Sequence, residues 1–362
     1  MMTHPADAHA SRRSRKRKPT VLAAVTAVTA ASLLAGCSSE EPAKPKRPDP
    51  VTPSPHSPPP SSAAPTPKTG GFSPYVDTSL KPSFDLVKGA EETGVKEYNL
   101  AFVSPGGGCV PKWGGRQALA ANPVARQADA LRAQGGDVRI SFGGQSGNEL
   151  ARVCGSVDKL VNAYRKVIEA YHLTKVDFDI EGPALTDTKA NDLRAQAIAR
   201  LQQDTKLDVS VTLPVLPSGL NRHAVAVLKS AKKNGARIST VNIMAMDYGT
   251  YYDGDMGTYA TAAATATQKQ IKGALGIRDE ATAWKSVGVT PMIGVNDVKG
   301  EVFRPDDAAE LKKFADEKGL GRLSMWSVTR DKPCPGGANL KAVATCSSLG
   351  KKTNEFVRAF TG

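Results

Sequence analysis

From residue 71 onward, short apolar segments rich in β-branched and aromatic residues alternate along the chain with amphipathic segments. In the amphipathic segments apolar residues recur three or four positions apart, which is the spacing of one helix face. We expect strands at 72–77, 98–103, 137–141, 175–180, 207–213, 240–246, 291–295 and 322–327, and helices at 124–133, 157–171, 188–204, 224–234 and 305–318. This alternation predicts an α/β protein built on a parallel sheet.

Eight predicted strands with intervening helices match a (β/α)8 TIM barrel, whose functional site forms at the carboxyl ends of the strands. A doubly wound open sheet gives a similar periodicity, but the number of strands favours the barrel. Residues 71–362 have enough length for one barrel of about 250 residues. We therefore predict a single catalytic domain over 71–362, without a second domain or an internal repeat.

The first 37 residues have the pattern of a secretion signal. Six basic residues between Arg12 and Lys18 precede a small apolar run at 21–35, which is too short to span a bilayer. The run ends in Leu-Ala-Gly-Cys, which resembles a bacterial lipobox and predicts lipidation at Cys37 after cleavage. Export by the general route and by a twin-arginine route both remain open, because Arg12 and Arg13 are adjacent.

Residues 38–70 are typical of an extended linker. Positions 40–70 contain eleven prolines and only one large apolar residue, Val51, so this stretch cannot bury a core. At about 3.1 Å per residue it could hold the domain up to ~100 Å from a lipid anchor. We expect a protein tethered to the extracellular face of the cell membrane, with release to the medium as the alternative.

The formal charge of +13 does not indicate a nucleic-acid partner. Six basic residues and one acidic residue lie in the predicted signal, so the rest of the chain carries about +8. Its lysines and arginines are dispersed, and no basic run is interleaved with aromatic residues. Moderate basicity is more consistent with work near an anionic cell surface.

Four cysteines remain once Cys37 is assigned to the lipobox. An even number in an exported protein indicates two disulfides, for which three pairings are possible. We favour Cys334 with Cys346, which closes a short Pro/Gly loop, and therefore Cys109 with Cys154. A zinc site is the alternative, but neither a Cys-x-x-Cys spacing nor a nearby histidine supports it.

The most informative segment is KVDFDIEG at 175–182. Side chains alternate in direction along a strand, so Asp177, Asp179 and Glu181 face one side while the apolar residues between them face the other. In a barrel the three acids line up inside, ~6–7 Å apart, which is electrostatically costly. Such a row persists where protons are shared or where a function requires it.

Three interpretations of this row are open. A divalent metal is one, although such sites usually take their ligands from loops, and we expect neither a metal nor another cofactor here. Ion pairs between the acids and inward-facing arginines are the second. Acid/base catalysis is the third, because burial and neighbouring negative charge raise the pKa of one carboxyl so that it can donate a proton near neutral pH.

The row resembles the signature of glycoside hydrolase family 18, Asp-x-x-Asp-x-Asp-x-Glu at the end of the fourth barrel strand. Asp177, Asp179 and Glu181 match its last three acids, whereas Thr174 stands at the first. The segment DFDIEG at 177–182 resembles the form of this signature in the branch that contains archaeal-type and actinobacterial chitinases. The departure at Thr174 concerns the acid that is least involved in the chemistry.

Other segments are similar to the family's motifs in the same order. Ser141-Phe-Gly-Gly fits Ser-x-Gly-Gly at the third strand, where Ser141 can hydrogen-bond the innermost aspartate. Met244-Ala-Met-Asp falls at the sixth strand and ends in Asp247, a predicted substrate contact. Met246 replaces the usual tyrosine, and we expect Tyr248 to supply the hydroxyl. The segment 324–331 fits the eighth strand and places Trp326 beneath the sugar.

The resemblance implies hydrolysis of β-1,4 bonds between N-acetylglucosamine residues in chitin or its oligosaccharides, with retention of configuration. Glu181 is the implied acid/base, Asp179 orients the acetamido group of the substrate, and Asp177 shares a proton with Asp179. Family 18 is a substrate-assisted exception to the rule of two catalytic carboxylates. The resemblance therefore demands an N-acetyl group on the sugar that is attacked.

Several alternatives remain. An endo-β-N-acetylglucosaminidase acting on N-glycans shares the same acids, a chitin-binding lectin on an inactive barrel generally lacks the glutamate, and a solute-binding lipoprotein needs no such row. His172 and His223 lie in no metal or nucleophile pattern, and no strand is followed by a phosphate-binding glycine loop. Aromatic residues form 6% of the chain, which predicts better activity on soluble oligomers than on crystalline chitin. We expect a monomer.

Overall fold

The computed structural model describes residues 70–350 and 352–362. The predicted signal peptide, Cys37 and the linker up to residue 69 lie outside the described residues. In the described part no helix is both long and apolar enough to cross a membrane.

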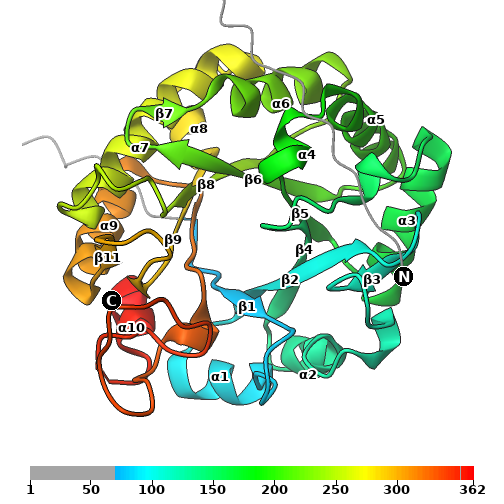
Figure 1. Ribbon diagram of the computed structural model, residues 1–362. Helices are drawn as coiled ribbons and strands as arrows, with labels where there is room; N and C mark the ends of the chain where they lie inside the picture. Colours follow the sequence, from blue (N-terminus) through cyan, green and yellow to red (C-terminus); the bar gives the residue numbers. More distant parts are fainter. Residues whose placement is uncertain (1–69, 351) are drawn as a thin grey trace, which may run out of the picture. The chain divides into compact units, whose positions relative to one another are not determined.

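Eight strands pair in parallel in the order in which they occur along the chain, and helices surround the curved sheet that they form (Figure 1). The parallel α/β sheet that the sequence predicted is thus confirmed. The strands are β1 (Tyr75–Asp77), β2 (Glu97–Pro105), β4 (Asp137–Gly143), β5 (Lys175–Asp179), β6 (Asp208–Leu216), β8 (Thr240–Ala245), β9 (Val287–Pro291) and β12 (Arg322–Leu323). Two short strands pair antiparallel with strands of this sheet: β3 (Pro111–Trp113) with β2 and β7 (Gly219–Leu220) with β6. A separate antiparallel pair is formed by β10 (Gly294–Val295) and β11 (Val302–Phe303).

The helices begin at side chains that cap their free backbone amides. Ser156, Asp187, Asn221 and Asp255 each accept a hydrogen bond from the first turn of the helix that follows. The helices are α1 (Leu86–Thr93), α2 (Ala128–Ala133), α3 (Val157–Ala170), α4 (Gly182–Thr186), α5 (Thr188–Asp204), α6 (Arg222–Lys233), α7 (Met256–Ile271), α8 (Glu280–Lys285), α9 (Pro305–Lys318) and α10 (Glu355–Thr361).

The seventh strand lies earlier than predicted. We expected it at 291–295, but β9 runs over Val287–Pro291 and pairs with both β8 and β12. Pro291 ends the strand, and Gly294 has a φ of +77°, which turns the chain away from the sheet. Helix α7 had no clear signal in the sequence, because six of its eight buried residues are small or polar (Gly257, Ala260, Ala263, Ala264, Thr267 and Gln268).

The outer face of β5 packs against the helices as the alternation of its side chains predicted. Phe178 stacks on Phe142 with ring centroids 5.3 Å apart and meets the edge of Tyr164 from α3 at 5.0 Å. Val176 and Ile180 are buried on the same side. This apolar contact fixes the strand with Asp177 and Asp179 facing the interior.

Both predicted disulfides are present. Cys109–Cys154 closes a loop of 45 residues and ties the segment after β2 to the start of α3, while Cys334–Cys346 closes a loop of 12. Loop-closure entropy assigns about 4 kcal/mol of stabilisation to the longer loop and about 3 kcal/mol to the shorter one. The sequence therefore identified the pairing correctly.

Candidate active site

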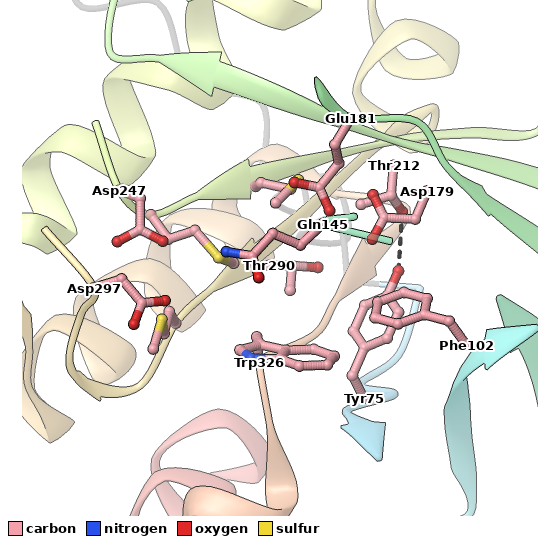
Figure 2. A pocket seen from close by; sticks show the side chains of 13 residues that line it. Tyr75, Phe102, Gln145, Asp179, Glu181, Thr212, Asp247, Thr290, Asp297 and Trp326 are labelled. Carbon is pink, nitrogen blue, oxygen red and sulfur yellow. Dashed lines mark hydrogen bonds between the residues drawn. The ribbon is translucent and has the colours of Figure 1, made fainter. Parts of the chain in front are cut away.

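A cavity of about 110 Å³ opens at the carboxyl ends of the strands, and Figure 2 shows its lining. Most of the strands contribute a side chain at or just after their last residue. This is the end of a parallel α/β sheet at which sites are built. The lining residues are Tyr75, Phe102, Gln145, Asp179, Glu181, Thr212, Met244, Met246, Asp247, Thr290, Met292, Asp297 and Trp326.

Asp177 lies beneath this cavity and is fully buried. Ser141 donates a hydrogen bond of 2.7 Å to Oδ2, and Ser210 donates one of 2.5 Å to Oδ1. Thr212 and Tyr75 place their hydroxyls within 3.0 Å of the same carboxyl group. Both oxygens of Asp177 are therefore occupied by hydroxyl groups, which offset part of the cost of burying a carboxyl.

Asp179 is the next inward-facing residue on β5 and lines the cavity. It is 4% exposed, and its Oδ1 is buried without a hydrogen-bond partner among the described residues. Burial raises the pKa of Asp179 well above its usual range, and the charges of Glu181 and Asp177 raise it further. A buried oxygen without a partner faces the site at which a ligand could donate a hydrogen bond.

Glu181 follows the end of β5, and its side chain points into the same cavity (Figure 2). Burial raises the pKa of Glu181, and the charge of Asp247 adds to this effect. A side-chain hydrogen bond with Asp179 acts in the opposite direction, but the net pKa remains raised. A carboxyl of this kind keeps its proton closer to neutral pH, which is the property a general acid needs.

Two glycines after Ser141 allow β4 and β5 to approach closely. A Cβ on Gly143, whose φ is +106°, would lie 2.1 Å from the backbone oxygen of Asp179. A Cβ on Gly144, with φ +98°, would lie 2.8 Å from the ring of Phe102. In the Ser-Phe-Gly-Gly segment, Ser141 therefore donates a hydrogen bond to Asp177 and Phe142 packs against α3. Gly143 leaves room for the backbone of β5.

The loop that carries Gln145 is held by a buried ion pair that the sequence analysis missed. Arg194 of α5 binds Oε2 of Glu149 through two nitrogens, at 2.8 and 3.1 Å, and Tyr164 donates a hydrogen bond of 2.5 Å to Oε1. Glu149 also accepts from the backbone amide of Ala151. The three partners lie far apart in the sequence, so no local pattern could have predicted their contact.

Aromatic side chains form one wall of the cavity. Trp326 stacks on Phe102 with ring centroids 5.5 Å apart and an angle of 18° between the planes, and lies 6.0 Å from the ring of Tyr75. Trp326 thus lines the cavity, and its role as a sugar platform stays a prediction. Trp113 donates to the hydroxyl of Tyr171, and Trp284 packs on Phe314, so neither of the other tryptophans lines the cavity.

The predicted role of Tyr248 as a substrate contact does not fit the structure. Asp247 has a left-handed backbone with φ +50°, which ends the strand alternation before Tyr248. The ring of Tyr248 is buried against Tyr252 and Tyr259, and Tyr248 is not among the residues that line the cavity. Met246 lines it instead.

Asp247 itself lines the cavity beside Asp297 (Figure 2). Its Oδ1 accepts a hydrogen bond of 3.1 Å from the amide of Val298, which links the loops after β8 and β9. Asn296 turns away and donates to the backbone oxygens of Met292 and Gly294. Ser141, Asp177, Asp179, Glu181, Asp247 and Trp326 are therefore brought together at one end of the sheet.

Residues that the sequence analysis missed complete the lining. Thr212, Met244 and Thr290 face inward because they continue the alternation of strands β6, β8 and β9. Extending the period-2 pattern of side chains through every strand would have found Thr212 and Met244. Phe102 and Gln145 carry no such signal.

Known proteins resemble this chain at the level of sequence and of structure. No model of a known protein family matches it. It is 36% identical over 284 residues to the probable bifunctional chitinase/lysozyme of Escherichia coli and 34% identical over 278 residues to endochitinase 11 of Metarhizium anisopliae. These matches cover 74% and 72% of this chain but only 31% and 52% of the relatives, so the chain spans about half or less of their length.

A solved structure matches over nearly all of its own length. The catalytic domain of the hyperthermophilic chitinase from Pyrococcus furiosus is 33% identical, with a TM-score of 0.73. The match covers 82% of this chain and 95% of that domain. The acidic row, the parallel α/β sheet and these similarities define a glycoside hydrolase. The chain belongs to glycoside hydrolase family 18, the family of these chitinases.

Replacement of Gly143 by alanine tests the close approach of β4 to Asp179. We expect Gly143→Ala to lose about 1–2 kcal/mol of unfolding free energy from left-handed strain and about 1–3 kcal/mol more from overpacking. Gly135→Ala is the matched control, because Gly135 has φ +77° but no atom within 4 Å of the added Cβ. Urea denaturation measures both. Equal losses in the two variants would contradict the proposed contact.

Proposed function

We propose that this protein hydrolyses β-1,4 bonds between N-acetylglucosamine residues in chitin or chitooligosaccharides, with retention of configuration and participation of the substrate's own acetamido group. The observation that carries the proposal is the pair formed by Glu181 and Asp179. One carboxyl has a raised pKa and points into the cavity, and the other presents a buried oxygen without a partner. Similarity to chitinases supports the substrate class.

In the first step Glu181 donates its proton to the glycosidic oxygen as the bond to the anomeric carbon breaks. The carbonyl oxygen of the acetamido group attacks that carbon and forms an oxazolinium ion. Glu181, now a carboxylate, then removes a proton from water, whose oxygen opens the ring at the anomeric carbon. The acetamido oxygen and the water attack the anomeric carbon from opposite faces, so the anomeric configuration is retained.

Asp179 is suited to hold the acetamido group during this sequence. Its free Oδ1 can accept the acetamido N–H, and its carboxyl group can stabilise the positive charge of the oxazolinium ion. Asp177 is the inward-facing residue before Asp179 on β5, and hydrogen bonds from four hydroxyl groups hold its carboxyl group in place. The two aspartates share the remaining proton in the proposed mechanism.

We propose further that the sheet closes into a complete (β/α)8 barrel. Residues next to the first strand and the last strand are joined by backbone hydrogen bonds from Ser73 to Leu323, at 2.9 Å, and from Tyr75 to Met325, at 3.0 Å. Phe72 and Leu323 also form a parallel bridge. These bonds support closure because they connect the two ends of the strand order.

The decisive experiment incubates the purified chain with chitotetraose, with the corresponding fully de-N-acetylated tetramer and with a high-mannose glycopeptide. We expect cleavage of chitotetraose only, because the attack requires the acetamido oxygen. Glu181→Gln is expected to lower kcat by roughly 10²–10⁴-fold with little change in KM, because the amide cannot supply a proton. Chromatography of the products measures each rate.

Glu169→Gln serves as the control, because Glu169 is exposed on α3 and does not line the cavity. It should cleave chitotetraose at the rate of the parent. Cleavage of the de-N-acetylated tetramer would exclude substrate assistance. Cleavage of the glycopeptide alone would identify an endo-β-N-acetylglucosaminidase, and binding without cleavage would identify a lectin.

The charge of Asp247 is expected to set the alkaline limit of activity. A negative charge at this position raises the pKa of Glu181, so Asp247→Asn should lower that pKa. Glu181 then loses its proton at a lower pH, and the alkaline limb of kcat/KM moves to lower pH. Asp297→Asn is the control, since it removes a carboxyl from the same cavity without being among the causes of the shift at Glu181. An unchanged limb in Asp247→Asn would refute this role.

We propose that the mature chain is lipid-anchored at Cys37 on the extracellular face of the cell membrane. The basic and apolar segments before the Leu-Ala-Gly-Cys sequence support this, and two disulfides suit an oxidising compartment. We expect the parent protein to sediment with membranes, to require detergent for release and to incorporate a labelled lipid. The Cys37→Ser variant should not incorporate the label. Ser38→Ala is the control. Lipid labelling of Cys37→Ser would contradict the anchor.

A further inference from the structure

A second cavity, of about 450 Å³, lies at the opposite end of the sheet from the candidate active site. Several of its residues are the first residues of their strands, among them Glu97 of β2, Lys175 of β5 and Arg322 of β12. Nothing in the proposed hydrolysis uses this end of the molecule. The cavity is lined by Gly70, Gly71, Phe72, Ser73, Lys96, Glu97, Arg139, Lys175, Asp208, Thr240, Gly321 and Arg322.

The charged residues of this cavity are mostly basic. Four cationic side chains face two acidic ones. Lys175 pairs with Glu97 at 2.8 Å and with Asp137 at 3.2 Å. Arg139 pairs with Asp208 at 2.8 Å. These pairs occupy the acidic groups that line the cavity, and among the described residues Lys96 has no ion pair with a carboxylate.

Arg322 is the most buried of these charged groups, at 6% exposure. Its Nη2 lies 3.3 Å from the hydroxyl of Ser210, but Nε and Nη1 have no hydrogen-bond partner among residues 70–350 and 352–362. The nearest carboxylate to Arg322 is that of Asp177, at 3.8 Å, and hydroxyl groups already occupy both of its oxygens. A buried guanidinium with two free donors is costly unless an acceptor fills the space before it.

Arg139 increases this demand for an acceptor. Burial lowers the pKa of Arg322, and the nearby positive charge of Arg139 lowers it further. Asp208 pairs with Arg139 and its charge also acts on Arg322, but a single carboxylate does not offset the charges of two guanidinium groups. The planar fork of a guanidinium matches the oxygen geometry of a phosphate, and a lysine at the rim adds a point charge.

We propose that this cavity is a binding site for a phosphate group, held by Arg322 and Arg139 with Lys96 at the rim. A phosphate at pH 7 carries between one and two negative charges, which would offset the excess of two positive charges among the side chains that line the cavity. The group could belong to inorganic phosphate or to the phosphate ester of a larger molecule. The site is separate from the hydrolytic cavity, so the proposal is independent of the proposed function.

Isothermal titration calorimetry with inorganic phosphate at fixed ionic strength tests the site directly. We expect saturable binding at one site per chain, and a roughly tenfold or greater loss of affinity in Arg322→Gln, which removes the buried charge. Glycerol 3-phosphate in a parallel titration distinguishes the source, because tighter binding of the ester indicates a phosphate ester as the ligand, and weaker binding indicates the free ion.

Lys96→Gln keeps the experiment interpretable if the buried variant does not fold, because Lys96 is exposed. It should weaken phosphate binding by roughly two- to fivefold through loss of one nearby charge. Lys229→Gln removes the same charge from an exposed position on α6 and should bind like the parent. Absence of saturable binding to the parent, or equal affinity in the parent, Lys96→Gln and Arg322→Gln, would overturn the proposal.

Discussion

The fully buried carboxyl group of Asp177 is the constraint on which the interior of this sheet depends. Removing a carboxyl from water costs several kcal/mol unless hydrogen bonds replace the solvent. Four hydroxyl groups from three strands supply those bonds: Tyr75 of β1, Ser141 of β4, and Ser210 and Thr212 of β6. The layer around Asp177 must therefore be polar, with Asn99, Asn242 and Ser324 also buried there. TIM barrels more often fill this volume with branched apolar side chains.

This polar layer explains why the acids above it can act in proton transfer. Asp177 is held by hydroxyl groups, whereas Asp179 has an oxygen without a partner and lies where burial and two neighbouring carboxyls raise its pKa. Glu181 stands at the end of the strand, less buried than the other two, with a moderately raised pKa. The alternation of side chains along one strand thus places three carboxyl groups in three different environments. These environments determine which carboxyl groups have a raised pKa.

The sequence predicted the parts of the structure that follow from periodicity and local motifs. The alternation of strand and helix segments predicted the parallel sheet, and the alternation of side-chain directions along β5 predicted that Asp177 and Asp179 face inward. The number and spacing of the cysteines led to the correct disulfide pairs. The prediction failed where the backbone leaves the regular pattern: the left-handed Asp247 turns Tyr248 away from the cavity, and the seventh strand ends at Pro291, where we had expected it to begin. Contacts between distant segments, such as Glu149 with Arg194, have no periodic signal.

The same polar interior connects the two ends of the sheet. Arg322 reaches from the first residue of β12 to within 3.8 Å of Asp177, and the charge of Asp177 in turn raises the pKa of Asp179. The charge of Glu181 also raises the pKa of Asp179. Charges this close interact strongly because little water screens them. An apolar interior would separate the two cavities electrostatically. Here the hydroxyl groups that make burial of Asp177 tolerable also place one unbroken series of charged groups between the cavities.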